Sequence, residues 1–368
     1  MKALILVLLL NLILISSAFA QEPRAIPKIA DKITLSGDVQ FRYEQSLTDS
    51  IDAQGKFSTD PVNENFRIRR ARIRVDAEVT KKLTMTSRIA LQEFNSPAGK
   101  VLEYAYFNYK FHNAFQIRAG QFKPPFVAEE LLSSNSLPVI DRGITTDLFN
   151  ANNYAAFQQG LMVHGKIKAV LPMNYYAGVF NGNGRNVRLD ENSGKNFVGR
   201  LEIFLIPDVR LGGNVQFADL EGDPWGKAWG ADLLLDRDSV LGDAIGFYFL
   251  GEYLEGNNLN AFDDTHLLNP HLDNFRMRGG YVTILLKWKT GSKLLPLLEI
   301  GGKYEVLNPL THRSNNSITQ LTPNIGIVFL PDNAARWQFN VIRTDYEREV
   351  VSAQKDHLLF VTQFQVRF

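Results

Sequence analysis

The sequence predicts an all-β fold, a 16-stranded antiparallel transmembrane β-barrel, on three observations. Residues 357–368 alternate between an apolar face ending at Phe368 and a polar face with Gln363, Gln365 and Arg367. Segments with the same period of two recur along the chain, and the connections between them alternate in length. Single strands of this kind would leave edge amides unpaired in a bilayer, at a cost on the order of several kcal/mol each. We therefore expect the sheet to close.

The first 20 residues have the pattern of a secretory signal peptide. Lys2 precedes an apolar run over residues 3–15, and Ala18 and Ala20 complete a small-x-small cleavage pattern. An uncleaved membrane anchor is the alternative, but the apolar run is short for a span of ~18 residues. We expect a signal peptide at 1–20, a short amino-terminal segment at 21–32 and the barrel at 33–368.

Composition excludes two classes of protein. The chain has 40 Lys and Arg against 39 Asp and Glu, so a bulk nucleic-acid-binding role is not expected. It has no cysteine, which excludes lipidation of a cysteine at the mature amino terminus. Any charge selectivity must then come from where the charges lie.

Sixteen segments are amphipathic or nearly so and are the expected strands. They are residues 33–43, 66–79, 83–94, 101–111, 115–122, 160–168, 174–181, 197–204, 209–218, 227–235, 245–254, 277–288, 297–306, 318–330, 335–343 and 357–368. In the second, the alternation breaks at Arg69 and Arg70, because Phe66 and Ile68 lie in the other phase. This break predicts a β-bulge.

The connections favour a membrane barrel over a soluble exported β protein. Short ones, such as 80–82, 112–114, 206–208 and 236–244, alternate with long ones, such as 44–64, 123–159, 182–196 and 255–276. Tight periplasmic turns and larger external loops are typical of outer-membrane barrels, and an even strand count places both termini on the periplasmic side. We therefore expect the cell outer membrane as the location.

Basic residues mark the expected inner wall. Arg70, Arg72 and Arg74 share one face of the second strand at a spacing of ~6.7 Å. Facing lipid, each would cost roughly 2–4 kcal/mol, so we expect them to face a water-filled lumen. Such a row can hand an anion from one cation to the next. Further basic residues on polar faces are Arg88, Lys110, Arg118 and Arg200.

A structural role for these arginines stays open. Pairing across strands with the acidic residues Asp38, Asp76, Glu78 and Glu202 would hold the wall in register. The pore would then be weakly selective.

The connection at 123–159 is too long for a structureless loop in a compact domain. It opens with a stiff Lys-Pro-Pro-Phe entry at 123–126 and continues through a segment that favours a helical turn at 128–132. We expect this third external loop to fold into the lumen, although an external flap is the alternative. Folded inward, it would bring Lys123, Glu129, Glu130, Asp141 and Arg142 to the constriction.

At these residues the sequence resembles the phosphate-selective porins O and P. The matching pieces are Arg-Arg-Ala-Arg at 69–72, Gly-Gln-Phe-Lys-Pro-Pro-Phe at 120–126 with Glu129, Asp-Arg at 141–142, Gly-Val-Phe-Asn-Gly at 178–182, Gly-Arg at 199–200 and Arg-Phe at 367–368. The resemblance implies a 16-stranded homotrimeric outer-membrane channel with an inward third loop. It also implies that Arg69, Arg70 and Lys123 contact anions.

The expected function is passive diffusion of small anions, phosphate among them, in contact with outer-membrane lipids. A weakly selective general porin for sugars or peptides is the alternative, because the chain is neutral overall and the long loop carries Glu129, Glu130 and Asp141. A barrel plugged by its own loop, acting in adhesion or as a scaffold, is a third possibility. An enzyme is not expected, since the sequence has no Gly-x-Ser-x-Gly element. No cofactor and no metal are expected, because the six histidines form no His-x-x-x-His pair.

Overall fold

The computed structural model describes residues 30–368, apart from residues 95, 97–98, 188, 191–192, 222–223, 267–269 and 349–353. The predicted signal peptide at 1–20 and most of the segment 21–32 lie outside the described residues. No helix in the described part of the chain is long and apolar enough to cross a bilayer.

The described residues form 16 strands, close to the predicted positions. They are β1 (Lys32–Ser46), β2 (Glu64–Glu78), β3 (Leu83–Ala90), β4 (Leu102–His112), β5 (Phe115–Phe122), β6 (Gln158–Ile167), β7 (Met173–Phe180), β8 (Asn196–Ile206), β9 (Val209–Asp219), β10 (Trp225–Leu241), β11 (Ile245–Asn257), β12 (Arg276–Lys289), β13 (Leu297–Asn308), β14 (Ile318–Leu330), β15 (Ala335–Tyr346) and β16 (His357–Arg367). The helices are α2 (Ala128–Leu131), α3 (Ile144–Ala151) and α4 (Leu259–Asp263), with 3₁₀ turns η1 (Leu91–Glu93), η2 (Gly242–Ala244), η3 (Leu272–Asn274) and η4 (Pro331–Asn333).

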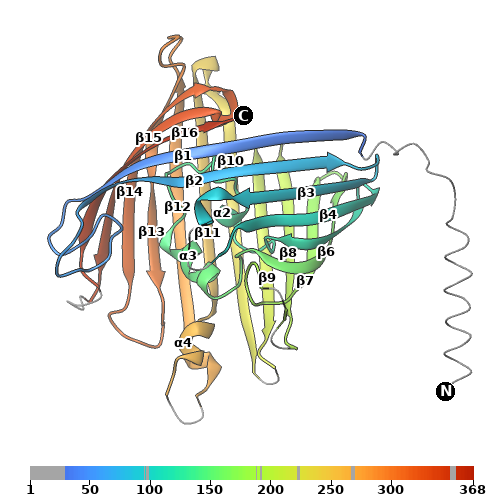
Figure 1. Ribbon diagram of the computed structural model, residues 1–368, viewed down its shortest axis with the longest axis horizontal. Helices are drawn as coiled ribbons and strands as arrows, with labels where there is room; N and C mark the ends of the chain where they lie inside the picture. Colours follow the sequence, from blue (N-terminus) through green and yellow to red (C-terminus); the bar gives the residue numbers. More distant parts are fainter. Residues whose placement is uncertain are drawn as a thin grey trace, which may run out of the picture.

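The strands form one closed antiparallel barrel, as predicted. Each strand pairs with its neighbours in sequence, and β1 pairs with β16 from Asp38 opposite Arg367 to Ser46 opposite Leu359. Figure 1 shows the strands as a continuous curved wall with α2 and α3 in its middle. Because the last strand closes on the first, every strand has a hydrogen-bonded partner on both sides.

The apolar faces of the strands point outward. On β1, Phe41 is 48% exposed whereas the next residue, Arg42, is 1% exposed, and on β16 Phe364 is exposed whereas Gln363 is buried. A soluble barrel would show the opposite pattern. This arrangement suits an apolar solvent outside the barrel and confirms the predicted assignment of faces on these strands.

Two strand ends differ most from prediction. β10 continues to Leu241, through residues expected in the turn at 236–244, and β3 ends at Ala90 where η1 begins. Alternation does not locate such ends, because a strand continues as long as its neighbour supplies hydrogen bonds.

Part of the inner wall is apolar, whereas the sequence predicted a polar lumen. Phe122, Phe180 and Leu254 are buried against Phe126 and Phe149, which belong to the connection between β5 and β6. We call this connection, residues 123–157, the long connection. Its apolar residues pack on the apolar part of the wall and exclude solvent from it.

The carboxyl-terminal residue, Phe368, packs against Gly37 of β1. Phe368 donates its N–H to the carbonyl of Gly37 at 3.0 Å and accepts the Gly37 N–H at 3.1 Å. A Cβ at position 37 would lie 2.7 Å from the Phe368 ring and 2.9 Å from the carbonyl oxygen of Arg72. The backbone carbonyl cannot move aside as a side chain can, so this site requires glycine.

We expect Gly37→Ala to lower the free energy of unfolding by about 1–3 kcal/mol, the usual cost of overpacking. Gly213→Ala is the matched control, because an added Cβ there meets no atom within 4 Å. Reversible urea unfolding in detergent or lipid measures both. Equal stability of the two variants would contradict the expected closure at Phe368.

Candidate functional site

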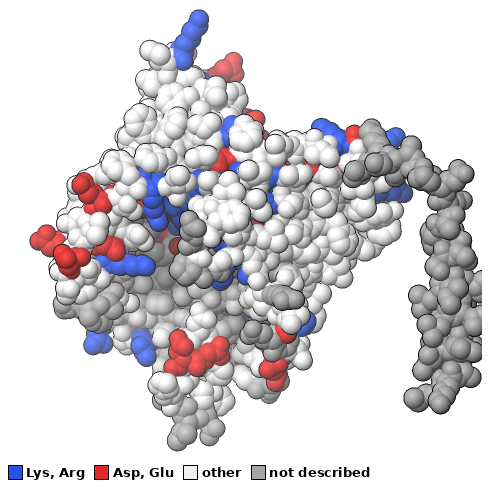
Figure 2. Space-filling view, viewed as in Figure 1, with Lys and Arg blue, Asp and Glu red and all other residues white. Residues whose placement is uncertain are grey.

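The largest group of basic side chains inside the barrel lines a cavity of about 670 Å³. Nine basic and five acidic residues contribute to it: Arg69, Arg70, Arg72, Arg74, Arg88, Lys100, Lys123, Arg142 and Arg185, with Glu93, Glu103, Glu130, Asp141 and Asp147. Figure 2 shows Lys and Arg side chains along the wall of the hollow on this face. The excess of cations makes the cavity attractive to anions.

The predicted bulge in β2 is present and shapes this cavity. Gln40 pairs with Arg70 and the next residue, Phe41, pairs with Ile68, so Arg69 has no partner on β1. With one extra residue on β2, Arg69 and Arg70 both line the cavity although they are adjacent in sequence.

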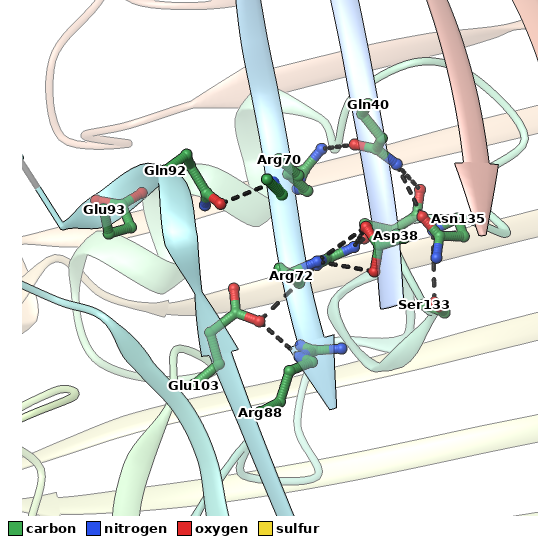
Figure 3. Close-up of polar contacts among 12 residues, drawn as sticks. Asp38, Gln40, Arg70, Arg72, Arg88, Gln92, Glu93, Glu103, Ser133 and Asn135 are labelled. Carbon is green, nitrogen blue, oxygen red and sulfur yellow. Dashed lines mark hydrogen bonds and ion pairs between the residues drawn. The ribbon is translucent and has the colours of Figure 1, made fainter. Parts of the chain in front are cut away.

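Three of the predicted arginines are neutralised by carboxylates. Arg72 pairs with Asp38 at 2.7 Å and Arg88 pairs with Glu103 at 2.6 Å. Figure 3 shows these contacts, with Glu103 between Arg72 and Arg88. Arg74 bonds to Asp76, two residues along the same strand, at 2.6 Å. The Arg72–Asp38 pair is the cross-strand pairing of the structural alternative, whereas Arg74 and Asp76 pair within one strand.

Among the arginines of β2, Arg69 and Arg70 are the least neutralised. Arg70 donates to the neutral amide oxygen of Gln40 at 2.8 Å, and the ion pairs found among the described residues do not include it. Arg69 lies 3.6 Å from Asp141. That carboxylate is already engaged by Arg42, whose guanidinium contacts it at 2.6 and 3.0 Å. Burial opposes ionisation of Asp141, but Arg42 and Arg69 hold its pKa well below the ordinary value.

The long connection brings Lys123 and Arg142 to the same cavity, on either side of Glu130. Each lies 2.6 Å from a Glu130 oxygen. Burial opposes ionisation of Glu130, but Lys123 and Arg142 lower its pKa below the ordinary value. Burial and Arg142, against Glu130, lower the pKa of the Lys123 ammonium to about 7.

Asp147, on α3, also titrates near neutral pH. Its side chain is exposed to the cavity, but desolvation by the surrounding protein and the nearby carboxylates of Asp141 and Glu129 raise its pKa to about 7. The net charge of the cavity therefore becomes less positive as the pH rises through 7.

Aromatic rings form one side of the cavity. Tyr104 and Phe157 lie edge to face at 4.9 Å, with the Arg88 guanidinium 4.4 Å from the Tyr104 ring and the Lys123 ammonium 5.0 Å from the Phe157 ring. These rings stabilise the two cations without neutralising them.

The other predicted residues lie elsewhere in the wall. Lys110 is exposed near the end of β4. Arg118 lies on β5 with its guanidinium 4.6 Å from the Tyr106 ring. Arg200, on β8, is fully buried and pairs with Glu202 at 3.0 Å and Asp232 at 2.8 Å. None of the three lines the cavity.

The long connection is fixed to the opposite side of the barrel. Glu305 of β13 accepts the N–H groups of Ile144 and Thr145 at 3.0 and 2.6 Å, at the start of α3. Lys303 of the same strand pairs with Glu129 at 3.0 Å. Since β13 is diametrically opposite β5 in strand order, these are the contacts expected of a segment folded into the lumen.

Further anchors come from β11 and β15. Glu252 accepts the N–H of Ala128 at 2.7 Å, Asn340 accepts the N–H of Ile140 at 2.8 Å, and Arg336 donates to the carbonyl of Leu137 at 2.7 Å. In the described part of the chain, no group of three His, Cys, Asp or Glu side chains is placed to hold a metal.

The comparisons with known proteins agree with this geometry. Residues 41–204 match the family model described as phosphate-selective porin O and P. The expected family resemblance is confirmed. A search of curated proteins finds no match.

Solved structures of outer-membrane channels share the fold. The outer membrane channel DcaP of Acinetobacter baumannii is 12% identical with a TM-score of 0.57, over 92% of this chain and 97% of that chain. The anion-selective porin from Comamonas acidovorans is 10% identical with a TM-score of 0.57, over 92% and 99%. OprB of Pseudomonas putida at high pH is 11% identical with a TM-score of 0.58, over 91% and 94%. At these identities the likeness concerns the porin fold.

Sequence reasoning missed several cavity residues. Lys100 and Arg185 belong to connections, where alternation assigns no face, and Arg185 lies 3.6 Å from Glu103. Glu103 lies at a shift of register between β3 and β4, which changes the phase of the alternation. Gln92 lies in η1, which was expected to be strand. No signal in the sequence placed these four residues at the cavity.

Glu305 provides a test of how the long connection is held. We expect Glu305→Ala to leave the N–H groups of Ile144 and Thr145 without an acceptor, at about 1–3 kcal/mol for the buried Thr145, and to raise hydrogen exchange at both residues. Glu255→Ala is the control, because Glu255 pairs with an Arg276 side chain that is 54% exposed. Unchanged exchange at α3 in the Glu305 variant would contradict this role.

Proposed function

We propose that the protein is an outer-membrane porin through which small anions, phosphate among them, diffuse passively. The single observation that carries the proposal is the pair Arg69 and Arg70. The bulge turns both toward one cavity, and Arg70 bonds to a neutral amide rather than to a carboxylate. A planar guanidinium can bind two oxygens of a phosphate or carboxylate at once.

The closed barrel, the outward apolar face and the family match over 41–204 support a channel in the outer membrane rather than an enzyme. Outer-membrane lipids would cover the apolar face. The name of the Comamonas acidovorans neighbour, an anion-selective porin, is consistent with anion transport here.

The proposal includes export and assembly. A signal peptide over 1–20 would be cleaved, leaving the amino-terminal segment and the barrel from residue 33. A homotrimer is the proposed assembly, and one neighbour, OmpT of Vibrio cholerae, is described in a trimer form.

A weakly selective general porin is the second candidate. The observation that favours it is the pairing of Arg72, Arg74 and Arg88 with carboxylates, which leaves a cavity of mixed charge. Neutral solutes such as sugars or short peptides would pass such a cavity. The two candidates differ in the sign and size of the reversal potential across a bilayer.

Removing Arg69 and Arg70 should weaken anion preference. A unit charge ~6 Å from an anion in water contributes about 0.7 kcal/mol, or about threefold in local anion concentration. In asymmetric KCl, the double variant Arg69→Met with Arg70→Met should lower the anion-to-cation permeability ratio several-fold, as calculated from the reversal potential. Arg343→Met is the control, because Arg343 is exposed and pairs with Asp345. Cation preference of the unmodified protein would overturn the anion proposal.

Anion preference should also fall between pH 6 and pH 8. Lys123 loses its proton and Asp147 becomes negative over this range, since both have a pKa of about 7, so the cavity loses positive charge through both groups. Reversal potentials at constant ionic strength measure the change, and Lys123→Met with Asp147→Asn should flatten it. Stronger anion preference at the higher pH would contradict the assignment of these groups.

A further inference from the structure

Strand β2 extends beyond the end of its neighbour β3 in the region of the bulge. The β2–β3 ladder ends with Arg72 opposite Ala90, and η1 follows directly. Toward its amino terminus, β2 continues from Arg72 to Glu64 along β1. The N–H groups on the β3 side of that stretch therefore lose the carbonyls that a continuing strand would offer.

For one of these N–H groups, a side chain supplies the acceptor. The amide oxygen of Gln92, in η1, accepts the N–H of Ala71 at 2.9 Å. Figure 3 shows Gln92 reaching from the end of β3 to β2, beside Arg70. Gln92 also lines the cavity. It is thus a backbone acceptor at the residue that follows the bulged pair.

The position of the bulge decides where Arg69 points. Successive residues of a strand face opposite sides, so Arg69 would face outward if β2 were regular with Arg70 facing inward. Phe66 and Ile68 face outward in the opposite phase to Ile73, so one extra residue must lie between them, and the hydrogen bonds of the backbone on both sides hold that residue at Arg69. β1 provides them on one side, opposite Arg70 and Ile68, and Gln92 on the other.

We propose that Gln92 is a positioning residue that fixes the β2 bulge and thereby keeps Arg69 and Arg70 together on the anion cavity. The inference rests on the proposed function for its consequence, although the positioning itself is a matter of geometry. A neutral amide suits the role, because it accepts the backbone hydrogen bond without neutralising the two guanidinium groups.

The first experiment measures the direction of residue 69 directly. The chain has no cysteine, so Arg69→Cys introduces a single thiol. Cysteine is also tolerated in lipid, which leaves the bulge dependent on its backbone contacts. We compare labelling of this thiol by a water-soluble, membrane-impermeant maleimide with Gln92 present and with Gln92→Met, which has similar size and only a weak acceptor.

We expect Gln92→Met to slow labelling at position 69 by about tenfold or more, because a slipped strand turns that residue to the lipid side. Arg74→Cys is the matched control. It lines the same cavity on the regular part of β2, and its labelling should not change. Gln92→Glu, which restores a carbonyl-type acceptor, should restore labelling at 69. Equal labelling rates at 69 with and without the Gln92→Met substitution would overturn the inference.

If Gln92→Met does not insert as a folded barrel, Gln92→Ser provides the same test, because its side chain is too short to reach Ala71. Labelling at 69 should slow in this variant too, and an unchanged rate would overturn the inference.

The second experiment connects the geometry to transport. In asymmetric KCl, Gln92→Met should move the reversal potential in the same direction as Arg69→Met, and should add no further shift in the Arg69→Met background. The inference would be overturned if Gln92→Met shifted the reversal potential as much in the Arg69→Met background as in the unmodified protein. Failure of the anion proposal is distinguishable, because the unmodified protein would then show no anion preference while the labelling result at position 69 still stood.

Discussion

The pairing of β1 with β16 is the interaction on which the rest of the structure depends. Until it forms, both strands have an edge of unpaired N–H and C=O groups, and a bilayer offers those groups no water. The contacts of Phe368 with Gly37 complete this pairing at one end of the seam. Closure fixes one side of every strand toward lipid and the other toward the interior. The charged residues that alternate with apolar ones along each strand therefore face the interior together.

Collecting charges in this way creates a second requirement, that they be compensated inside the barrel. Part of the compensation is local, as in the Arg72–Asp38 pair of adjacent strands. Part comes from the long connection, whose Glu130 and Asp141 contact cations of the wall and of the connection itself. In return, Glu305 and Lys303 of β13 bind the connection from across the barrel. The Arg42–Asp141 and Lys303–Glu129 pairs therefore both neutralise cations of the wall and hold the connection in place.

The compensation is incomplete at Arg69 and Arg70, and a backbone irregularity is the reason. A regular β2 would alternate, with one of Arg69 and Arg70 facing inward. The bulge turns both inward, while the carboxylate nearest to them, Asp141, is already bound by Arg42. A surplus of positive charge thus remains beside an open cavity, and its amount depends on Lys123 and Asp147, which titrate near neutral pH.

The sequence by itself determined the barrel, the strand positions, the faces of β1 and β16 and the bulge at Arg69, because a period of two and its interruption are written in consecutive residues. It also indicated that Arg72, Arg74 and Lys123 would face the interior. It did not separate Arg70, which lacks a carboxylate partner among the described residues, from Arg200, which pairs with two carboxylates and lies outside the cavity. Only the tertiary structure decided which cations are neutralised and brought Arg185 and Gln92 to the cavity. The physical reason is that compensation depends on distances between residues far apart in the chain, and alternation within one strand carries no information about them.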